Sequence, residues 1–155
     1  EVPLVLVDPD RPAVDSPAAA LVERLDASAV SIIGGEVAIP EAVAHQVAAG
    51  VPWDRLAGVD RFDTAYQLAR AASRAGAASD DVHVATGDDF PDALTAGPAA
   101  LHRGGVVVLT GGLRLPRSTA RLLRDAPDGT TVRLVGGPRA VSAEVERRLQ
   151  DALDG

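Results

Sequence analysis

The sequence predicts an α/β fold in which a parallel β-sheet is flanked by helices. Three observations lead to this fold class. Short apolar runs of strand length recur along the chain, segments with helical periodicity lie between them, and part of the pattern occurs twice at a separation of 102 positions. Strands that alternate with helices are typical of βα units, whose consecutive strands lie parallel.

Five short runs have the composition of buried strands. Each contains consecutive aliphatic residues, many of them β-branched, as in parallel strands that are buried on both faces. The five runs are LVLVD (4–8), VSIIG (30–34), VHVAT (82–86), VVVLT (106–110) and VRLVG (132–136).

Two longer segments show helical periodicity with a capping residue at the start. Asp60 is the expected N-cap of a helix over residues 62–75, and Ser142 is the expected N-cap of a helix that follows it. The residues expected to face the core are Phe62, Ala65, Leu68, Ala69 and Ala72 in the first helix and Val145, Leu149 and Ala152 in the second.

An internal repeat organises the chain. A shift of 102 positions without gaps aligns residues 4–8 with 106–110, 16–21 with 118–123, and 30–43 with 132–145. The chain is therefore expected to hold the C-terminal half of one repeat in residues 1–50 and one complete repeat in residues 51–155.

The composition argues against several functions. The net charge is −7, whereas a nucleic-acid-binding domain has a basic surface, so no nucleic acid partner is expected. The absence of cysteine excludes disulfides and thiol chemistry. No apolar run approaches the roughly 20 residues of a membrane span. Glu1 opens the chain without a signal-peptide pattern, as expected of a mature or internal segment.

Two double glycines, Gly34–Gly35 and Gly136–Gly137, each end a predicted strand. Glycine permits the positive φ of a tight turn toward a helix. The same position in α/β proteins can bind phosphate, at the carboxyl edge of the sheet. Neither pair extends to a GxGxxG or GxxxxGK[ST] motif, so structural turns are favoured.

The segment ATGDDFPDAL (85–94) has two interpretations. In the first, Asp88 or Asp89 caps the following helix, Pro91 occupies its first turn, and Asp92 interacts with its positive end. In the second, Asp88, Asp89 and Asp92 hold Mg²⁺ in a metal-dependent enzyme. The structural interpretation is favoured because the three histidines are scattered and no paired ligand motif is present. No catalytic residue, metal or cofactor is expected.

The segment RLAGVDRFDTA (55–65) places Arg55 and Arg61 on either side of a glycine. The two guanidinium groups can form a bidentate clamp on a carboxylate or phosphate. The alternative is a set of exposed Arg–Asp pairs, each worth about 0–1 kcal/mol, and the spacing alone favours this alternative.

Together these segments resemble the cell wall-binding repeat 2 (CWB2) family of secreted and surface proteins of Gram-positive bacteria. The resemblance rests on RLAGVDRFDTA, VATGDDFPDALTAGPAA, VVVLTGG and VRLVGGPRAVSAEV; it covers residues 55–150 as one repeat and about 3–48 as half of another. The matching positions are Arg55, Gly58, Asp60, Arg61, Thr64, Ala65, Gly87, Phe90, Pro91, Asp92, Ala93, Leu94, Gly136 and Gly137.

The resemblance implies a Rossmann- or toprim-like module, extracellular and cell wall-associated, that anchors a secreted protein to the wall without catalysis. It also implies that three repeats pack together and bind an anionic secondary polymer of the wall. Arg55 and Arg61 are the expected polymer contacts, and the other motif residues, Asp92 among them, are expected to be structural.

Two alternatives to the wall-binding function remain at the level of sequence. One is a self-assembling surface scaffold, because an incomplete repeat exposes apolar faces that favour a homo-oligomer or packing with further repeats. The other is the metal-dependent enzyme that uses Asp88, Asp89 and Asp92.

Overall fold

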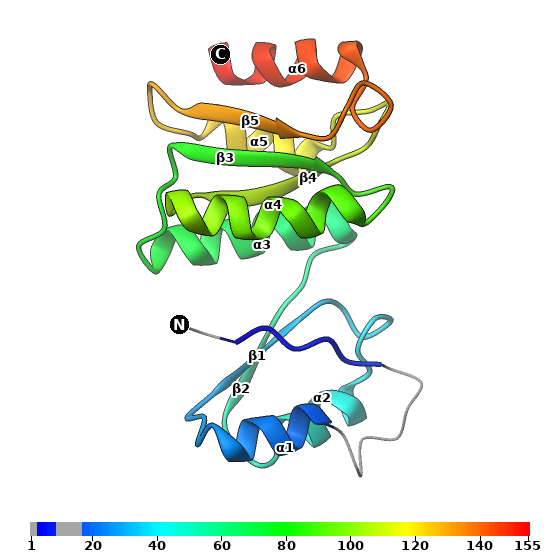
Figure 1. Ribbon diagram of the computed structural model, residues 1–155, viewed down its shortest axis with the longest axis vertical. Coiled ribbons are helices and arrows are strands. Elements are labelled where there is room, and N and C mark those ends of the chain that lie inside the picture. Colours follow the sequence, from blue (N-terminus) through cyan, green and yellow to red (C-terminus); the bar gives the residue numbers. More distant parts are fainter. Residues whose placement is uncertain (1–2, 9–16) are drawn as a thin grey trace. The chain divides into compact units, whose positions relative to one another are not determined.

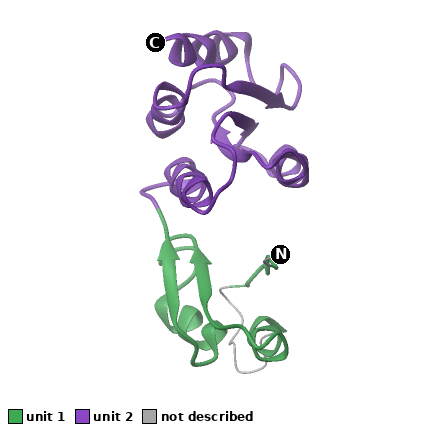
Figure 2. Cartoon of the chain, turned by 90° about the vertical axis from the view of Figure 1, so that its left-hand side faces the viewer, with its two compact units in different colours: residues 1–57 green, residues 58–155 purple. Residues whose placement is uncertain are grey.

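The computed structural model describes residues 3–8 and 17–155. The chain divides into two compact units, residues 1–57 (unit 1) and residues 58–155 (unit 2), as Figure 2 shows.

Unit 1 contains two helices and two parallel strands in its described part. The order is α1 (Pro17–Arg24), β1 (Val30–Ile33), α2 (Glu41–Ala48) and β2 (Trp53–Leu56). In the two-stranded sheet, Val30 lies opposite Trp53 and Ile33 lies opposite Leu56. The buried residues of this unit's core are Ala18, Ile32, Val43, Ala44 and Val47, and Trp53 packs against them.

Unit 2 is a three-stranded parallel sheet with four helices (Figure 1). Its elements are α3 (Arg61–Arg74), β3 (Asp81–Thr86), α4 (Pro91–Arg103), β4 (Val106–Thr110), α5 (Arg117–Arg124), β5 (Thr131–Val135) and α6 (Ala143–Asp154). The central strand is β3, with β4 on one side and β5 on the other. This architecture confirms the predicted α/β fold class.

The main hydrophobic cluster of unit 2 lies on one face of the sheet. Val82 and Val84 of β3 and Val106 and Val108 of β4 form one cluster with side chains of α3, α5 and α6. Helix α4 also packs on the sheet but contributes no residue to this cluster. Because successive side chains of a strand point to opposite faces, we assign α4 to the other face.

The predicted strand over residues 4–8 is wrong, because residues 3–8 form no regular secondary structure. The other four predicted strands are present as β1, β3, β4 and β5. In unit 2 the segment aligned with residues 4–8 is β4, which pairs with β3. Among the described residues of unit 1, no strand pairs with residues 4–8 in the way that β3 pairs with β4.

The aligned half-repeats have the same turn after their strands. Gly34 has a φ of 124° and Gly136 has a φ of 122°. In the first turn, the amides of Ala38 and Ile39 donate to the Gly35 carbonyl at 2.9 Å. In the second turn, the amides of Ala140 and Val141 donate to the Gly137 carbonyl at 2.9 and 3.1 Å. The double glycines are therefore tight strand-to-helix turns.

Both predicted N-caps are confirmed. The Asp60 carboxylate accepts the amide hydrogen of Asp63 at 2.8 Å, and the Ser142 hydroxyl accepts that of Val145 at 3.4 Å.

The predicted core face of α3 is partly wrong, because Leu68 is 41% exposed while Tyr66 is 4% exposed. Phe62, Tyr66 and Ala69 are the buried residues of this helix, at spacings of four and three. At 3.6 residues per turn, Leu68 lies about 120° away from Phe62 around the helix.

An ion pair joins the start of β3 to β5. Arg133 donates from its Nε and Nη2 atoms to the Asp81 carboxylate at 3.3 Å. The hydrogen bond from Arg133 lowers the pKa of Asp81 below its ordinary value of 3.8. A lowered folded-state pKa adds stability above the unfolded-state value, and this contribution is lost as the pH falls through the folded-state value.

We therefore expect Asp81→Asn to lower the stability of unit 2 at neutral pH and to weaken the loss of stability that acid causes below about pH 4. Urea unfolding followed by circular dichroism at pH 7 and at about pH 3 measures both effects. Asp80→Asn is the matched control, since no described residue forms an ion pair with Asp80. An equal acid response in Asp81→Asn and the unmodified chain would contradict the assignment.

Candidate functional site

Loops at the carboxyl edge of the unit 2 sheet are joined by hydrogen bonds. The amide of Gly112 donates to Asp88 Oδ2 at 2.7 Å, which links the loop after β4 to the loop after β3. The Gly112 carbonyl accepts the amide hydrogen of Ser142 at 3.0 Å, which adds the loop after β5. The Asp88 carboxylate thus has a structural partner.

The three carboxylates of residues 85–94 do not form a metal site. Asp89 accepts the amide hydrogen of the next residue, Phe90, at 2.8 Å, and Asp92 lies against Gly136. Within residues 3–8 and 17–155, no three His, Cys, Asp or Glu side chains are grouped as they would be to hold a metal ion. The metal-dependent enzyme therefore gains no support.

The start of α4 differs in part from the prediction. Pro91 occupies the first turn, as expected, but the N-cap is Phe90 and no side chain caps the helix. The predicted caps, Asp88 and Asp89, bond instead to Gly112 and to Phe90. The Asp88 carboxylate, which the local sequence favours as a helix cap, instead links the loop after β3 to the loop after β4.

The motif around Gly58 forms a hydrogen-bonded start to α3. The Gly58 amide donates to Thr64 Oγ1 at 3.0 Å, and the same hydroxyl donates to the Asp60 carbonyl at 2.9 Å. The Val59 amide donates to Asp63 Oδ2 at 3.1 Å. Asp60, Asp63 and Thr64 therefore all contact the backbone at the start of α3.

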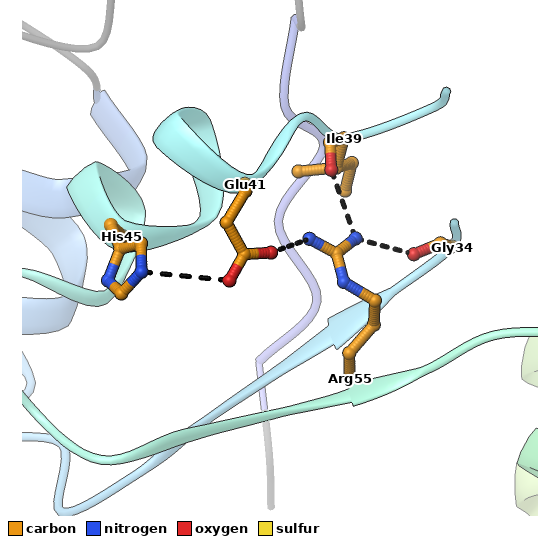
Figure 3. A network of polar contacts seen from close by, with 5 residues as sticks. All are labelled: Gly34, Ile39, Glu41, His45 and Arg55. Carbon is orange, nitrogen blue, oxygen red and sulfur yellow. Dashed lines mark hydrogen bonds and ion pairs between the residues drawn. The ribbon is translucent and has the colours of Figure 1, made fainter. Parts of the chain in front are cut away.

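Arg55 lies at the centre of the polar network in Figure 3. Its Nη1 atom donates to the Gly34 carbonyl at 2.8 Å and to the Ile39 carbonyl at 3.0 Å, and Nη2 is 3.3 Å from Glu41 Oε2. Glu41 Oε1 is in turn 3.6 Å from His45 Nε2. The Arg55 side chain is 16% exposed. The guanidinium thus holds β2 against the turn that connects β1 to α2.

Arg61 lies in unit 2 and bonds to the turn after β3. Its Nη1 atom donates to the Gly87 carbonyl at 2.7 Å, and the residue is exposed. Arg55 and Arg61 thus each contact backbone within their own unit. Their role as ligand contacts stays a prediction.

A cavity of about 350 Å³, the α3–α5 cavity, carries a second group of arginines. It is lined by residues of α3, of α5 and of the start of β4, including Tyr66, Arg70, Arg74 and Asp125. The buried Tyr66 hydroxyl accepts a hydrogen bond from Arg70 Nη1 at 3.0 Å. The guanidinium carbons of Arg70 and Arg121 lie 5.7 and 5.8 Å from the centre of the Tyr66 ring.

The charge at the α3–α5 cavity is locally positive in a chain whose net charge is −7. Arg70, Arg74 and Arg121 are all exposed, and the lining carboxylate, Asp125, is 3.6 Å from Arg121 Nε. Planar guanidinium groups bind carboxylates and phosphates through paired hydrogen bonds. This arginine group was not predicted from the sequence, although the spacing of four between Arg70 and Arg74 indicates that both lie on one side of a helix.

Comparison with known proteins identifies a family and related chains. The family described as cell wall binding domain 2 (CWB2) matches residues 55–146. N-acetylmuramoyl-L-alanine amidase LytC of Bacillus subtilis (strain 168) is 31% identical over 121 residues, which are 77% of this chain and 23% of LytC.

Two solved structures from Clostridium difficile share the fold. Cwp6 superposes with a TM-score of 0.72 at 22% identity, over 86% of this chain and 21% of Cwp6. Cwp8 superposes with a TM-score of 0.63 at 28% identity, over 81% of this chain and 20% of Cwp8. This chain therefore spans less than a quarter of each of these three relatives.

No helix in the described part of the chain is long and apolar enough to cross a membrane. The family match covers more than half of the sequence and includes the Gly58 motif, Arg61 and the whole of the α3–α5 cavity. The chain therefore belongs to the cell wall binding domain 2 family and is a cell wall-binding module, located outside the cell at the wall.

Proposed function

We propose that the chain binds an anionic wall polysaccharide through the arginines of the α3–α5 cavity and anchors a secreted protein without catalysis. The observation that carries the proposal is that Arg70 and Arg74 line one cavity while Arg121 lies over the ring of Tyr66, which lines the same cavity. Their exposed guanidinium groups are available to phosphate or carboxylate groups of a polymer.

The attraction of an anionic polymer to this chain depends on the arginines at the site and not on the charge of the whole chain. A net charge of −7 repels an anionic polymer at long range, so attraction depends on short-range contacts with the arginine group. Salt screens such contacts, with a Debye length of about 10 Å at 0.1 M. A polymer with repeated charges also engages several modules at once, which raises the overall affinity without a new contact.

The experiment is cosedimentation with purified walls before and after the secondary polymers are removed, over a salt series. We expect Arg70→Ala/Arg74→Ala to weaken binding by about tenfold or more, since two charge-assisted contacts are lost. Arg147→Ala/Arg148→Ala is the matched control: it removes the same charge from α6, where both arginines pair with Glu144. Equal binding by the two double variants would overturn the proposed site.

The predicted contacts Arg55 and Arg61 are tested in the same assay. Arg61→Ala removes an exposed guanidinium at the carboxyl edge of the sheet. Loss of binding in Arg61→Ala, with full binding in Arg70→Ala/Arg74→Ala, would move the site to that edge. Arg55→Ala also removes two hydrogen bonds to backbone carbonyls, so the thermal unfolding of this variant is measured alongside its binding.

The noncatalytic part of the proposal rests on the match to a family that is described by binding. The relative LytC is an amidase, but this chain spans only 23% of it. The test is to measure free amino groups in the cosedimentation supernatants, because hydrolysis of amide bonds in the wall would release new amino groups.

A second candidate function, a self-assembling scaffold, is favoured by one feature of α4. Phe90, at its N-cap, and Leu94 and Leu101 within it are 70%, 60% and 80% exposed. Spacings of four and seven place these side chains on one side of the helix, and an exposed apolar stripe of this kind is typical of a contact surface. Sedimentation equilibrium measures the molecular mass in solution and so tests whether the chain self-associates through this stripe.

A further inference from the structure

We propose that the outer edge of β5 binds the opening strand of a further repeat. The occupant would be a parallel strand with the pattern of Trp53–Leu56, including an arginine at the position of Arg55. In the sheet of unit 2, β5 pairs with β3 on one side and no described strand occupies its other side. This inference concerns how repeats join and does not depend on the polymer site.

Strand β2 shows how the opening strand of a repeat is used. By sequence, β2 lies at the start of the predicted complete repeat, residues 51–155. In the structure it pairs with β1, which belongs to the preceding half-repeat, and both strands lie in unit 1. The opening strand thus completes the sheet of the repeat before it. Because β1 aligns with β5, an opening strand can pair with β5 in the way that β2 pairs with β1.

The amide directions on β1 define the edge that β2 occupies. The Val30 amide donates to the Pro52 carbonyl at 3.0 Å, and the Gly34 amide donates to the Leu56 carbonyl at 2.9 Å. In a parallel pair, the amides that point toward one neighbour come from alternate residues. The even-numbered amides of this strand therefore point toward β2. A shift of 102 positions carries them to even-numbered amides of β5.

On β5 the odd-numbered amides point the other way. The Thr131 amide donates to the Asp80 carbonyl at 2.8 Å, toward β3. The amides of Val132 and Leu134 therefore point to the outer edge, where no described strand lies. The edge that β2 occupies on β1 is thus the edge that is free on β5.

Burial and the Arg55 contacts support the same occupant. Ile32 of β1 is 3% exposed beside β2, whereas the aligned Leu134 is only half-buried. Arg55 donates to the carbonyls of Gly34 and Ile39, and the aligned carbonyls belong to Gly136 and Val141. In the described part of the chain, neither of these two carbonyls accepts a side-chain hydrogen bond. An incoming strand with an arginine at this position would find the same pair of acceptors.

The test adds such a strand to the full chain. One variant carries a flexible linker and a copy of residues 49–57, AGVPWDRLA, after Gly155. We expect hydrogen exchange at Val132 and Leu134 to slow by about tenfold or more, with little change at Thr131 and Arg133, because a docked strand protects only the outward amides. A synthetic peptide of residues 49–60, added in trans, tests the same contact without a linker.

Two control extensions separate strand docking from a general effect. An extension with the same residues in scrambled order is expected to give no protection. An extension in which the copied arginine is alanine is expected to give weaker protection. Unchanged exchange at Val132 and Leu134 with both the extension and the peptide would overturn the proposal. Protection of these amides in the unextended chain at rising concentration would also overturn it, by assigning the edge to a second copy.

Discussion

Gly58→Ala is expected to lower the free energy of unfolding of unit 2 by about 2–4 kcal/mol. A Cβ atom at this position would lie 2.5 Å from the Asp63 Cβ and 2.6 Å from the Asp63 carbonyl carbon, and it would also contact Asp63 Oδ2. Asp63 belongs to the first turn of α3, whose position is fixed by the Asp60 cap. The chain therefore cannot make room without loss of hydrogen bonds at the start of the helix.

Gly97→Ala is the matched control for this substitution. Gly97 lies within α4, and no atom outside the local helix backbone lies within 4 Å of its Cβ position. Alanine has a higher helix propensity than glycine, so this variant is expected to gain up to about 1 kcal/mol. Urea unfolding followed by circular dichroism gives both values. A loss of similar size in the two variants would show that the close approach at Gly58 is not the cause.

The strands of unit 2 could be predicted from the sequence because each contains a short run rich in aliphatic residues. Val82 and Val84 are fully buried between helices, and only aliphatic residues suit such positions. Strand β2 was missed because Asp54 and Arg55 interrupt its apolar pattern. Its pairing depends on β1 and on the Arg55 contacts with backbone carbonyls, which composition alone does not reveal.

The candidate site was less predictable than the fold. The sequence singled out Arg55 and Arg61 by their spacing around a glycine, and the structure places both guanidiniums on backbone carbonyls. The α3–α5 cavity joins Arg70 of one helix to Arg121 of another, and only the packing of α3 on α5 brings them to one tyrosine ring. Contacts between residues about fifty positions apart leave no local pattern.

The turn after β5 gives the second large expected effect. Gly136→Ala is expected to lower the free energy of unfolding of unit 2 by about 2–4 kcal/mol, from backbone strain together with a close contact. The φ of Gly136 is 122°, which side chains other than glycine rarely adopt. Its Cβ position lies 2.5 Å from Asp92 Oδ2 and 2.9 Å from the Ala140 Cβ.

Gly137→Ala is the matched control within the same dipeptide. Apart from Gly137 and its two chain neighbours, no residue has an atom within 4 Å of this Cβ position, and Gly137 is not among the glycines with positive φ. We therefore expect a change within about 0.5 kcal/mol. Urea unfolding of both variants separates the two glycines. If Gly136→Ala alone is destabilised, the first glycine of the pair is required by the turn and by Asp92. If both variants are destabilised alike, the turn would require glycine at both positions, and the close approach of Gly136 to Asp92 would not be the cause.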